Sequence, residues 1–294
     1  MQFSFNRKTV AEFLACIKAD QTEPVYYVAN PGNAGDAAIA LGTFHLFDRL
    51  GLDYETLSSE DLPKLEGKTI LFGGGGNLIE GRYSDLYNII SRYVEANRCI
   101  VLPHTIFGYE DLISRVKDGN LTVFCREETS YNLCVMENGL DNGNIFLDDD
   151  LAFSIDEEFL RPFREKAGQG TANCFRTDSE ASGLHPVPGD NRDISYSWNG
   201  ALWFDKDLTE SVVRSLLIYL SGFESVRTDR LHVAILGTLI GRTVFLYPNF
   251  YYKNRSVFEM SLKKYPNTYF INTSTDLLHS EYVQYLLDKN GITK

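Results

Sequence analysis

The sequence predicts an α/β protein made of two Rossmann-like, doubly wound domains that face a cleft. Short apolar runs alternate with amphipathic stretches along the chain, which is typical of βαβ units around parallel sheets. Glycine-rich or polar residues follow several of these runs, as they do where loops leave the carboxyl ends of parallel strands. The chain has 294 residues, which is enough for two domains of about 150 residues each.

The first domain is expected to span residues 1–155. Its strand at 69–72 should end in a loop of four glycines, residues 73–76. Its strand at 99–102 should stop at Pro103, because proline has no backbone N–H to donate to a sheet. In full, the pattern predicts strands at 25–29, 69–72, 99–102, 121–125 and 144–147, and helices at 37–50, 85–96 and 127–138.

The second domain is expected to span residues 156–294, after a crossover at 156–170. Residues 177–192 are rich in Gly, Pro, Asp and Ser, which indicates a loop. The remaining pattern predicts strands at 171–175, 225–227 and 243–247, helices at 208–220 and 230–240, and a closing C-terminal helix at 275–290.

Charge and composition exclude several classes of protein. The 28 basic and 40 acidic residues give a net charge of −12, so the basic footprint needed for general nucleic-acid binding or a polybasic membrane anchor is missing. Five scattered cysteines without a CxxC pair indicate neither a disulfide framework nor a metal site. We find no signal-peptide pattern and no apolar run near the ~18 residues that span a bilayer. We therefore expect a cytoplasmic protein without a transmembrane segment.

Three loops of the first domain carry candidate binding residues. The run Asn30-Pro31-Gly32-Asn33-Ala34-Gly35-Asp36 follows the first strand, and its glycines allow a ligand to approach the backbone. The alternative is a plain turn in which Asp36 caps the helix. Gly73-Gly74-Gly75-Gly76-Asn77 follows the next strand, and so many glycines favour close approach of a ligand. His104 lies just past a third strand, where these loops should converge. None of the loops is GxGxxG, so a nicotinamide-dependent dehydrogenase is disfavoured.

Two further segments carry charged side chains at strand ends. The charge pattern favours a solvent-exposed helix start at Arg126-Glu127-Glu128-Thr129-Ser130. In Arg227-Thr228-Asp229-Arg230-Leu231-His232, Thr228 or Asp229 can cap a helix whose first turn holds Arg230 and His232. Cations at that end of a helix are unfavourable unless an anion compensates them. The alternative is that an acid pairs with Arg230 and that His232 is buried. Arg176, at the end of the second domain's first strand, supplies another guanidinium.

Seven motifs together resemble the polysaccharide pyruvyl transferase family. They occur in the family's order between about residues 30 and 260, and the family's two-domain fold is similar to that of GT-B glycosyltransferases. The motifs are Gly32-Asn33-Ala34-Gly35-Asp36, Gly74-Gly75-Gly76-Asn77-Leu78, Leu102-Pro103-His104-Thr105-Ile106, Arg126-Glu127-Glu128-Thr129-Ser130, Asp150-Leu151-Ala152-Phe153, Thr228-Asp229-Arg230-Leu231-His232 and Asn249-Phe250-Tyr251-Tyr252-Lys253.

The resemblance implies transfer of a pyruvyl group from phosphoenolpyruvate to two hydroxyls of a sugar, giving a cyclic ketal and phosphate. Phosphoenolpyruvate would be a co-substrate bound by the second domain, and no other cofactor is implied. The donor-binding residues would be Arg176, Asp229, Arg230, Leu231 and His232, with Arg230 and His232 catalytic and His232 the general acid/base. The acceptor would bind the first domain at Gly32, Asn33, Gly35, Asp36, Gly75, Gly76, Asn77 and His104. His104 departs from the family, which more often has Gln there.

Several questions stay open at this point. The two-domain pattern also fits a glycosyltransferase that uses a nucleotide-sugar, or a non-catalytic protein that binds a sugar or an anion. The base on the acceptor side could be Asp36 or His104. The acceptor sugar is undetermined, and a lipid-linked acceptor would place the enzyme at the inner face of the membrane. The net negative charge does not oppose an anionic donor, because a few well-placed cations outweigh distant charges that salt screens.

Overall fold

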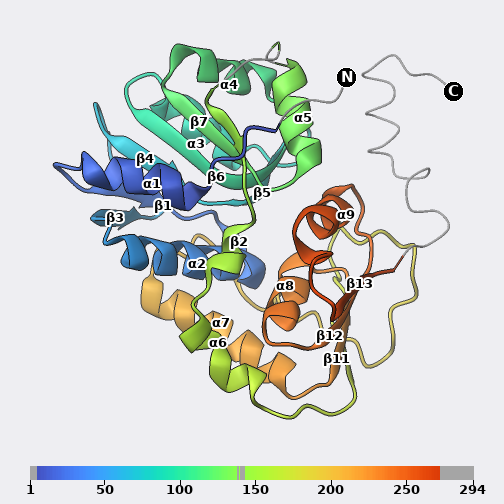
Figure 1. Ribbon diagram of the computed structural model, residues 1–294. Helices are drawn as coiled ribbons and strands as arrows, with labels where there is room; N and C mark the ends of the chain where they lie inside the picture. The colour runs from blue at the N-terminus through green and yellow to red at the C-terminus, as the bar shows by residue number, and fades with distance from the viewer. Residues whose placement is uncertain (1–4, 138, 140–142, 272–294) are drawn as a thin grey trace, which may run out of the picture. The chain divides into compact units, whose positions relative to one another are not determined.

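The computed structural model describes residues 5–137, 139 and 143–271, drawn as ribbons in Figure 1. The chain divides into two compact units. Of the described residues, the first unit holds those up to Glu157 together with Trp198–Val213, and the second holds Glu158–Ser197 and residues 214–271. Each unit contains a parallel β-sheet, so the predicted α/β class is confirmed. The helix predicted at 275–290 lies outside the described residues.

The first unit is built around a seven-stranded sheet in which every pair of neighbouring strands is parallel. The strand order is β3-β1-β4-β6-β7-β8, with β5 beside β6. The chain moves from β1 out to β3 and then returns to β4 on the other side of β1, so the sheet is doubly wound with a switch point between β1 and β4. The strands are β1 Val25–Val28, β3 Tyr54–Leu57, β4 Thr69–Phe72, β5 Gly75–Ile79, β6 Arg98–Phe107, β7 Leu121–Cys125 and β8 Ile145–Leu147.

Helices surround this sheet, and α5 packs against β6, β7 and β8. Buried side chains of the strands and of α2 form the core. The helices are α1 Val10–Ala19, α2 Ala34–Leu50, α3 Asp85–Tyr93, α4 Glu110–Ile113 and α5 Glu128–Glu137, with 3-10 helices η1 Ser114–Asp118 and η2 Leu151–Ser154.

Strand β6 corrects the prediction that Pro103 ends the third strand. The strand continues to Phe107, and its pairing with β7 shifts register between Val101 and His104. Pro103 therefore falls at an irregularity of the ladder, where its missing N–H removes no regular hydrogen bond. The predicted glycine loop is also partly strand, because β5 begins at Gly75.

Helix α2 begins three residues earlier than predicted. Asn33 is its N-cap, and the side-chain oxygen of Asn33 accepts a hydrogen bond from the N–H of Gly35 at 2.8 Å. The interpretation of Asp36 as the cap is therefore wrong, since Asp36 lies within the first turn. A carboxylate in the first turn is favourable because that end of the helix is positive.

A segment from the later part of the sequence also belongs to the first unit. In it, β10 (Asn199–Gly200) pairs antiparallel with β2 (Gly32–Asn33). The buried indole of Trp203 donates a hydrogen bond to the carbonyl oxygen of Gly32 at 3.1 Å. Helix α7 (Lys206–Ser221) begins in this segment. The sequence pattern assigned these residues to the second domain.

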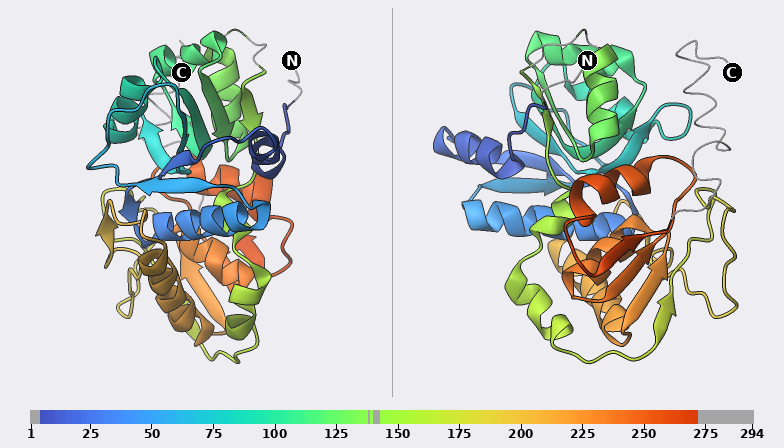
Figure 2. Two further views of the ribbon diagram at one scale, coloured as in Figure 1. Left: turned by 90° about the vertical axis from the view of Figure 1, so that its left-hand side faces the viewer. Right: turned by 45° about the vertical axis from the view of Figure 1, so that its right-hand side comes forward.

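The second unit contains a four-stranded parallel sheet in the order β13-β12-β11-β9. Helix α8 packs on β11 and β12, and Figure 2 shows these elements from two further sides. Because β9 and β11 are parallel neighbours, the residues after both strands emerge at the same edge of the sheet. The elements are β9 Thr171–Asn173, β11 Ser225–Thr228, β12 Thr243–Leu246, β13 Thr268–Phe270, α6 Glu157–Arg164, α8 Leu231–Leu239, α9 Lys253–Val257 and a π-helical turn η3 Phe258–Leu262.

Candidate functional site

The glycine loops of the first unit meet around the carboxylate of Asp36. The side-chain amide of Asn30 donates to Asp36 Oδ1 at 3.0 Å. Gly32 and Gly75 have φ values of 153° and 156°, which L-residues with a Cβ rarely adopt. A Cβ at Gly32 would lie 2.2 Å from Asp36 Oδ2, and one at Gly75 would lie 2.5 Å from Asn30 Nδ2. The structure thus brings together the predicted residues Gly32, Gly75 and Asp36.

The glycine run is explained largely by packing within the protein. A Cβ at Gly73 would lie 2.6 Å from the backbone nitrogen of Asn30, and one at Gly74 would lie 2.6 Å from the carbonyl oxygen of Pro103. Atoms of the protein itself therefore make the close approach at Gly73, Gly74 and Gly75 that we expected a ligand to make.

His104 is fully buried beneath these loops. Its Nε2 accepts a hydrogen bond from the backbone N–H of Asn77 at 3.0 Å, and the side chain of Asn77 donates to the carbonyl oxygen of Pro31 at 3.0 Å. Burial, together with the charge of Arg126, lowers the pKa of His104 to about 3. The ring is therefore neutral at physiological pH and positions Asn77. These properties do not suit His104 to act as the base on the acceptor side.

The segment that begins at Arg126 is buried, which corrects its interpretation as a solvated helix start. The Arg126 guanidinium donates to Thr105 Oγ1 at 2.9 Å and to Asp150 Oδ2 at 2.8 Å. Asp150 also accepts from the N–H of Ala152 at the start of η2. Burial raises the pKa of Glu127, although hydrogen bonds from Ser130 oppose that shift. These side chains form a buried polar network.

A cavity of about 500 Å³ opens beside these loops within the first unit. The predicted residues Gly32 and Asn77 line it. The other lining residues follow β1 and β3, lie on α3 or belong to the later segment: Pro31, Ser59, Glu60, Asp85, Asn88, Ile89, Asn199, Gly200 and Ala201. Neither α3 nor residues 199–201 were singled out from the sequence, because nothing local links them to the glycine loops.

In the second unit, hydrogen bonds between the ends of β9 and β11 hold Arg176 next to the start of α8. Asp229 Oδ1 accepts the backbone N–H of Arg176 at 2.7 Å. Thr228 Oγ1 donates to the carbonyl oxygen of Cys174 at 2.6 Å and accepts the N–H of Arg230 at 2.9 Å. Arg230 is the N-cap of α8, which begins at Leu231, so Thr228 satisfies a backbone donor at the helix start.

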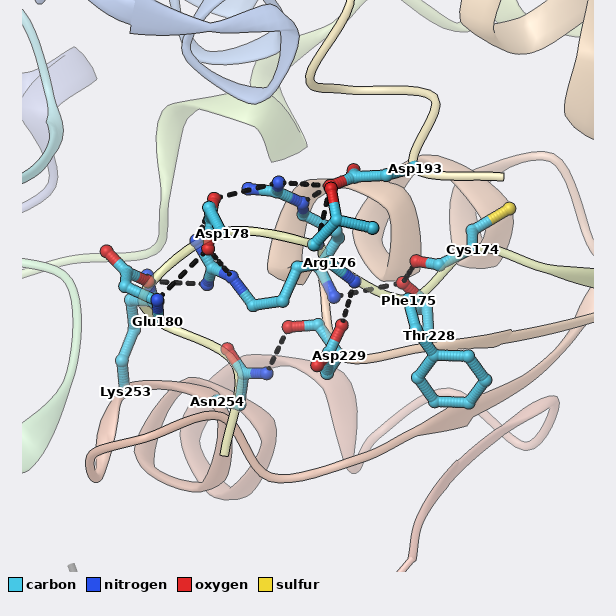
Figure 3. A network of polar contacts seen from close by, with 12 residues as sticks. Cys174, Phe175, Arg176, Asp178, Glu180, Asp193, Thr228, Asp229, Lys253 and Asn254 are labelled. Carbon is cyan, nitrogen blue, oxygen red and sulfur yellow. Dashed lines mark hydrogen bonds and ion pairs between the residues drawn. The ribbon is translucent and has the colours of Figure 1, made fainter. Parts of the chain in front are cut away.

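Carboxylates surround the two guanidinium groups (Figure 3). Asp178 contacts both, with Oδ1 at 2.7 Å from Arg176 Nε and Oδ2 at 2.8 Å from Arg230 Nη2. Asp193 binds the Arg230 guanidinium through two bonds of 2.8 and 2.5 Å. Glu180 bridges Arg176 and Lys253 at 2.5 and 2.9 Å. The alternative in which an acid pairs with Arg230 is therefore realised.

These ion pairs are largely withdrawn from solvent. The side chains of Arg176 and Arg230 are 6% and 4% exposed. Burial alone would lower the pKa of Arg176, but the charges of Glu180 and Asp178 raise it above its ordinary value. Burial would raise the pKa of Asp178, but Arg176 and Arg230 lower it. Both shifts favour the ionised forms of Arg176 and Asp178. Three cations gather at one sheet edge, and acids from residues 178–193 neutralise them.

The other predicted residues of the second unit lie beside this cluster in the chain. Leu231 is buried, and His232 is half-buried at the second position of α8. Sequence reasoning did not single out His185, whose Nε2 lies 3.4 Å from Asp229 Oδ2 and whose ring packs against Phe175. His185 lies in a segment whose composition indicated only a loop.

Asn254 is a second residue that sequence reasoning missed. Its buried side chain donates to the carbonyl oxygens of Asp229 and Tyr247 at 2.7 and 2.9 Å. These bonds fix the turn that leads into α8. Asn254 directly follows the last motif noted in the sequence, and nothing local showed which carbonyls it would reach.

The chain is similar to known proteins of one family. The family model described as polysaccharide pyruvyl transferase matches residues 33–249. The chain belongs to the polysaccharide pyruvyl transferase family. It is 25% identical to a Bacillus subtilis (strain 168) protein named "Putative pyruvyl transferase EpsO", with 81% of this chain and 84% of that protein covered.

A solved structure is also similar. The crystal structure of protein KP1_0663 from Klebsiella pneumoniae subsp. pneumoniae NTUH-K2044, described as functionally uncharacterised, matches with a TM-score of 0.77 and 38% identity. The match covers 89% of this chain and 98% of that one. The family resemblance inferred from the seven motifs is thereby confirmed.

No helix in residues 5–137, 139 or 143–271 combines the length and the apolar character needed to cross a membrane. Within the same part of the chain, no group of three or more His, Cys, Asp or Glu side chains is arranged to hold a metal ion.

Proposed function

We propose that this pyruvyl transferase moves a pyruvyl group from phosphoenolpyruvate to two hydroxyls of a saccharide, forming a cyclic ketal and releasing phosphate. The observation that carries the proposal is the pair of guanidinium groups, Arg176 and Arg230, which contact one shared carboxylate at the edge of the second sheet. Phosphoenolpyruvate carries two anionic groups, a carboxylate and a phosphate. Guanidinium groups bind both kinds of anion through paired hydrogen bonds.

The donor would take the place of carboxylates that the protein itself supplies. Asp178 and Asp193 bind the guanidinium groups with the same oxygen–nitrogen geometry that a substrate carboxylate or phosphate oxygen would use. Donor binding then exchanges one set of charge-assisted hydrogen bonds for another. The backbone N–H groups at the start of α8, which also favour anions, assist on the same side.

His232 is the proposed general acid and base. Histidine is the side chain most often used to exchange protons in catalysis near neutral pH. In the reaction, the methylene carbon of the donor gains a proton from His232, and a sugar hydroxyl oxygen attacks the neighbouring carbon. The bond from that carbon to the phosphate oxygen breaks, and the second hydroxyl closes the ring. Of the two hydroxyl protons, one restores His232 and the other leaves with phosphate. Arg230 stabilises the charge that develops on the leaving phosphate.

On the acceptor side, the proposal uses the loops of the first unit around Gly32, Asp36 and Asn77. Asp36 is the candidate base that takes up a hydroxyl proton before it is passed on, because His104 is a fully buried, weak base with a pKa of about 3 and its Nε2 already accepts from Asn77. The GT-B-like arrangement expected from the sequence is part of the proposal, since transfer requires donor and acceptor to meet. So is a cytoplasmic location, which is supported by five cysteines that form no disulfide. A lipid-linked acceptor is one form that the saccharide could take.

The test is to replace His232 by Ala and by Gln and to measure ketal formation together with donor binding. We expect both variants to lose roughly 10²–10⁴-fold in turnover while their affinity for phosphoenolpyruvate stays within a few-fold of the parent. Rescue by Gln would indicate a structural role, and near-normal turnover of the Ala variant would remove His232 from the mechanism.

The same assays separate the alternatives. Thermal stabilisation by nucleotide-sugars but not by phosphoenolpyruvate would favour a glycosyltransferase. Binding of phosphoenolpyruvate without release of phosphate in the presence of any acceptor would favour a non-catalytic binding protein.

A further inference from the structure

The cavity of the first unit lies where a parallel sheet of this topology binds ligands. The sheet order reverses between β1 and β4, and ligands of such sheets bind outside the carboxyl ends of the strands at that reversal. Gly32 follows β1, and Asn77 lies in β5, which follows β4 after a short connection. Both residues line the cavity. Its volume of about 500 Å³ falls within the range of about 300–1,000 Å³ that is usual for small-molecule sites.

The walls of the cavity come from parts of the chain that are far apart in sequence, and hydrogen bonds hold them together. Residues 199 and 200 pair with Asn33 and Gly32 across the β2–β10 ladder, and Trp203 anchors the same segment through its indole N–H. On the opposite element, Asp85, Asn88 and Ile89 are spaced three and four residues apart on α3, so they share one helix face. The cavity is therefore part of the folded unit.

Its lining suits a polyhydroxyl ligand. The side chains of Asn77, Asn88 and Asn199 offer amide donors and acceptors, and Ser59 offers a hydroxyl. Ile89 adds an apolar surface. A sugar ring presents hydroxyl groups around its edge and C–H groups on its faces, so both kinds of lining would be used.

The charged side chains that line the cavity are all acidic. Glu60 and Asp85 carry carboxylates, and no Lys, Arg or His is found among the described residues that line the cavity. A uronic acid or a sugar phosphate in this cavity would meet like charges without a compensating cation. An uncharged sugar would avoid that repulsion, and an amino sugar would gain an attraction from its ammonium group.

We propose that this cavity binds the acceptor sugar and that Glu60 and Asp85 restrict it to an uncharged or amine-bearing residue, against sugars that carry a carboxylate or a phosphate. The identification of the occupant as the acceptor rests on the proposed function. The charge selection rests on the lining alone. The cavity and the guanidinium cluster then divide the substrates by charge: the anionic donor binds the second unit, and a sugar without negative charge binds the first.

The test measures binding of defined oligosaccharides to the full chain without phosphoenolpyruvate. Three probes of similar size are compared by calorimetry or saturation-transfer NMR: an uncharged oligosaccharide, a glucosamine oligomer and a uronic-acid oligomer. We expect the parent protein to bind the uronic-acid probe at least tenfold more weakly than its best probe. In the double variant E60Q/D85N, that discrimination should fall to about threefold or less. The matched control E66Q/D118N removes two exposed carboxylates of the same unit outside the cavity and should keep the parent pattern.

A second variant tests the location. Replacing Asn88 by Trp adds bulk on the exposed side of α3 that faces the cavity, and should abolish binding of every sugar probe while phosphoenolpyruvate still stabilises the protein. Uronic-acid binding by the parent as tight as that of its best probe would overturn the inference. So would a double variant whose preferences match those of E66Q/D118N, or an N88W variant that binds sugars normally.

These outcomes are separate from the proposed function. If the binding pattern holds but no ketal forms with any acceptor, the proposed function fails and the charge selection stands. If ketals form preferentially on uronic acids, the proposed function stands and the charge selection fails.

Discussion

Replacing Asp193 by Asn tests whether the donor displaces a carboxylate of the protein. Asp193 makes two bonds to the Arg230 guanidinium, at 2.8 and 2.5 Å, and the two side chains are 6% and 4% exposed. A hydrogen bond to a charged group contributes about 1.5–3 kcal/mol. Asp178 still contacts Arg230 in the variant, so the guanidinium keeps one partner. We therefore expect D193N to lower the free energy of unfolding by about 1.5–3 kcal/mol.

The free energy of unfolding that D193N loses should reappear as tighter binding of the donor. In the parent protein, an incoming anion must replace Asp193, whereas in D193N it binds a guanidinium that is short of a partner. If the donor's hydrogen bonds to Arg230 restore the stability that D193N lost, the donor's dissociation constant should fall by about 10- to 100-fold, since each 1.4 kcal/mol is a factor of ten. Calorimetric titration with phosphoenolpyruvate and with inorganic phosphate measures this change, and urea unfolding with and without donor measures the stability.

The matched control is D190N, which makes the same chemical change three residues away. Asp190 accepts a hydrogen bond from the side chain of Asn173 at the exposed edge of β9. We expect D190N to bind phosphoenolpyruvate with the affinity of the parent. Weaker or unchanged donor binding by D193N, together with its loss of stability, would show that the donor does not displace Asp193. Asp193 would then keep its ion pair with Arg230 when the donor is bound, and its role would be to position the guanidinium.

Three further predictions concern the first unit. Because His104 is buried with a pKa of about 3, the unfolded state takes up a proton that the folded ring does not, so stability should fall between pH 6.5 and pH 3 by up to about 1.4 kcal/mol per pH unit. H104Q, which can still accept from Asn77, should lose this part of the pH dependence in urea unfolding at pH 7 and pH 4.5. G75A should cost roughly 1–3 kcal/mol, because its Cβ strains a positive φ and meets Asn30; an unchanged unfolding midpoint would contradict the packing described. R126Q should cost about 3–5 kcal/mol, because it leaves a buried aspartate without its cation, and calorimetric melting would show the loss.

The order of strands and helices was predictable because each element carries its own local pattern. The apolar run at 25–28 and the helix that follows it are examples. The course of β6 through Pro103 was not predictable, because it depends on a register shift between neighbouring strands. The placement of residues 199–213 in the first unit could not be predicted either. It depends on contacts such as a two-residue ladder and one indole hydrogen bond, which leave no local pattern in the sequence.

In the candidate site, too, the residues with a local sequence pattern were predictable and those that depend on distant contacts were not. The sequence identified Arg176 and Arg230, because arginines at strand ends and helix starts are recognisable locally. It could not identify Asp193 as a partner of Arg230, because the two residues are 37 positions apart and meet only in the folded unit. The glycines marked a place of close approach correctly, but their pattern could not tell whether a ligand or the protein itself fills the space.

Identifying the reaction product tests ketal formation directly. The chain is incubated with phosphoenolpyruvate and an oligosaccharide panel, phosphate release is followed, and the product is examined by proton NMR. Ketal formation predicts that one phosphate is released for each sugar modified and that the product shows the proton signal of a methyl group on the ketal carbon. Vinylidene signals from an enol ether, phosphate release without sugar modification, or no reaction with any acceptor would contradict it.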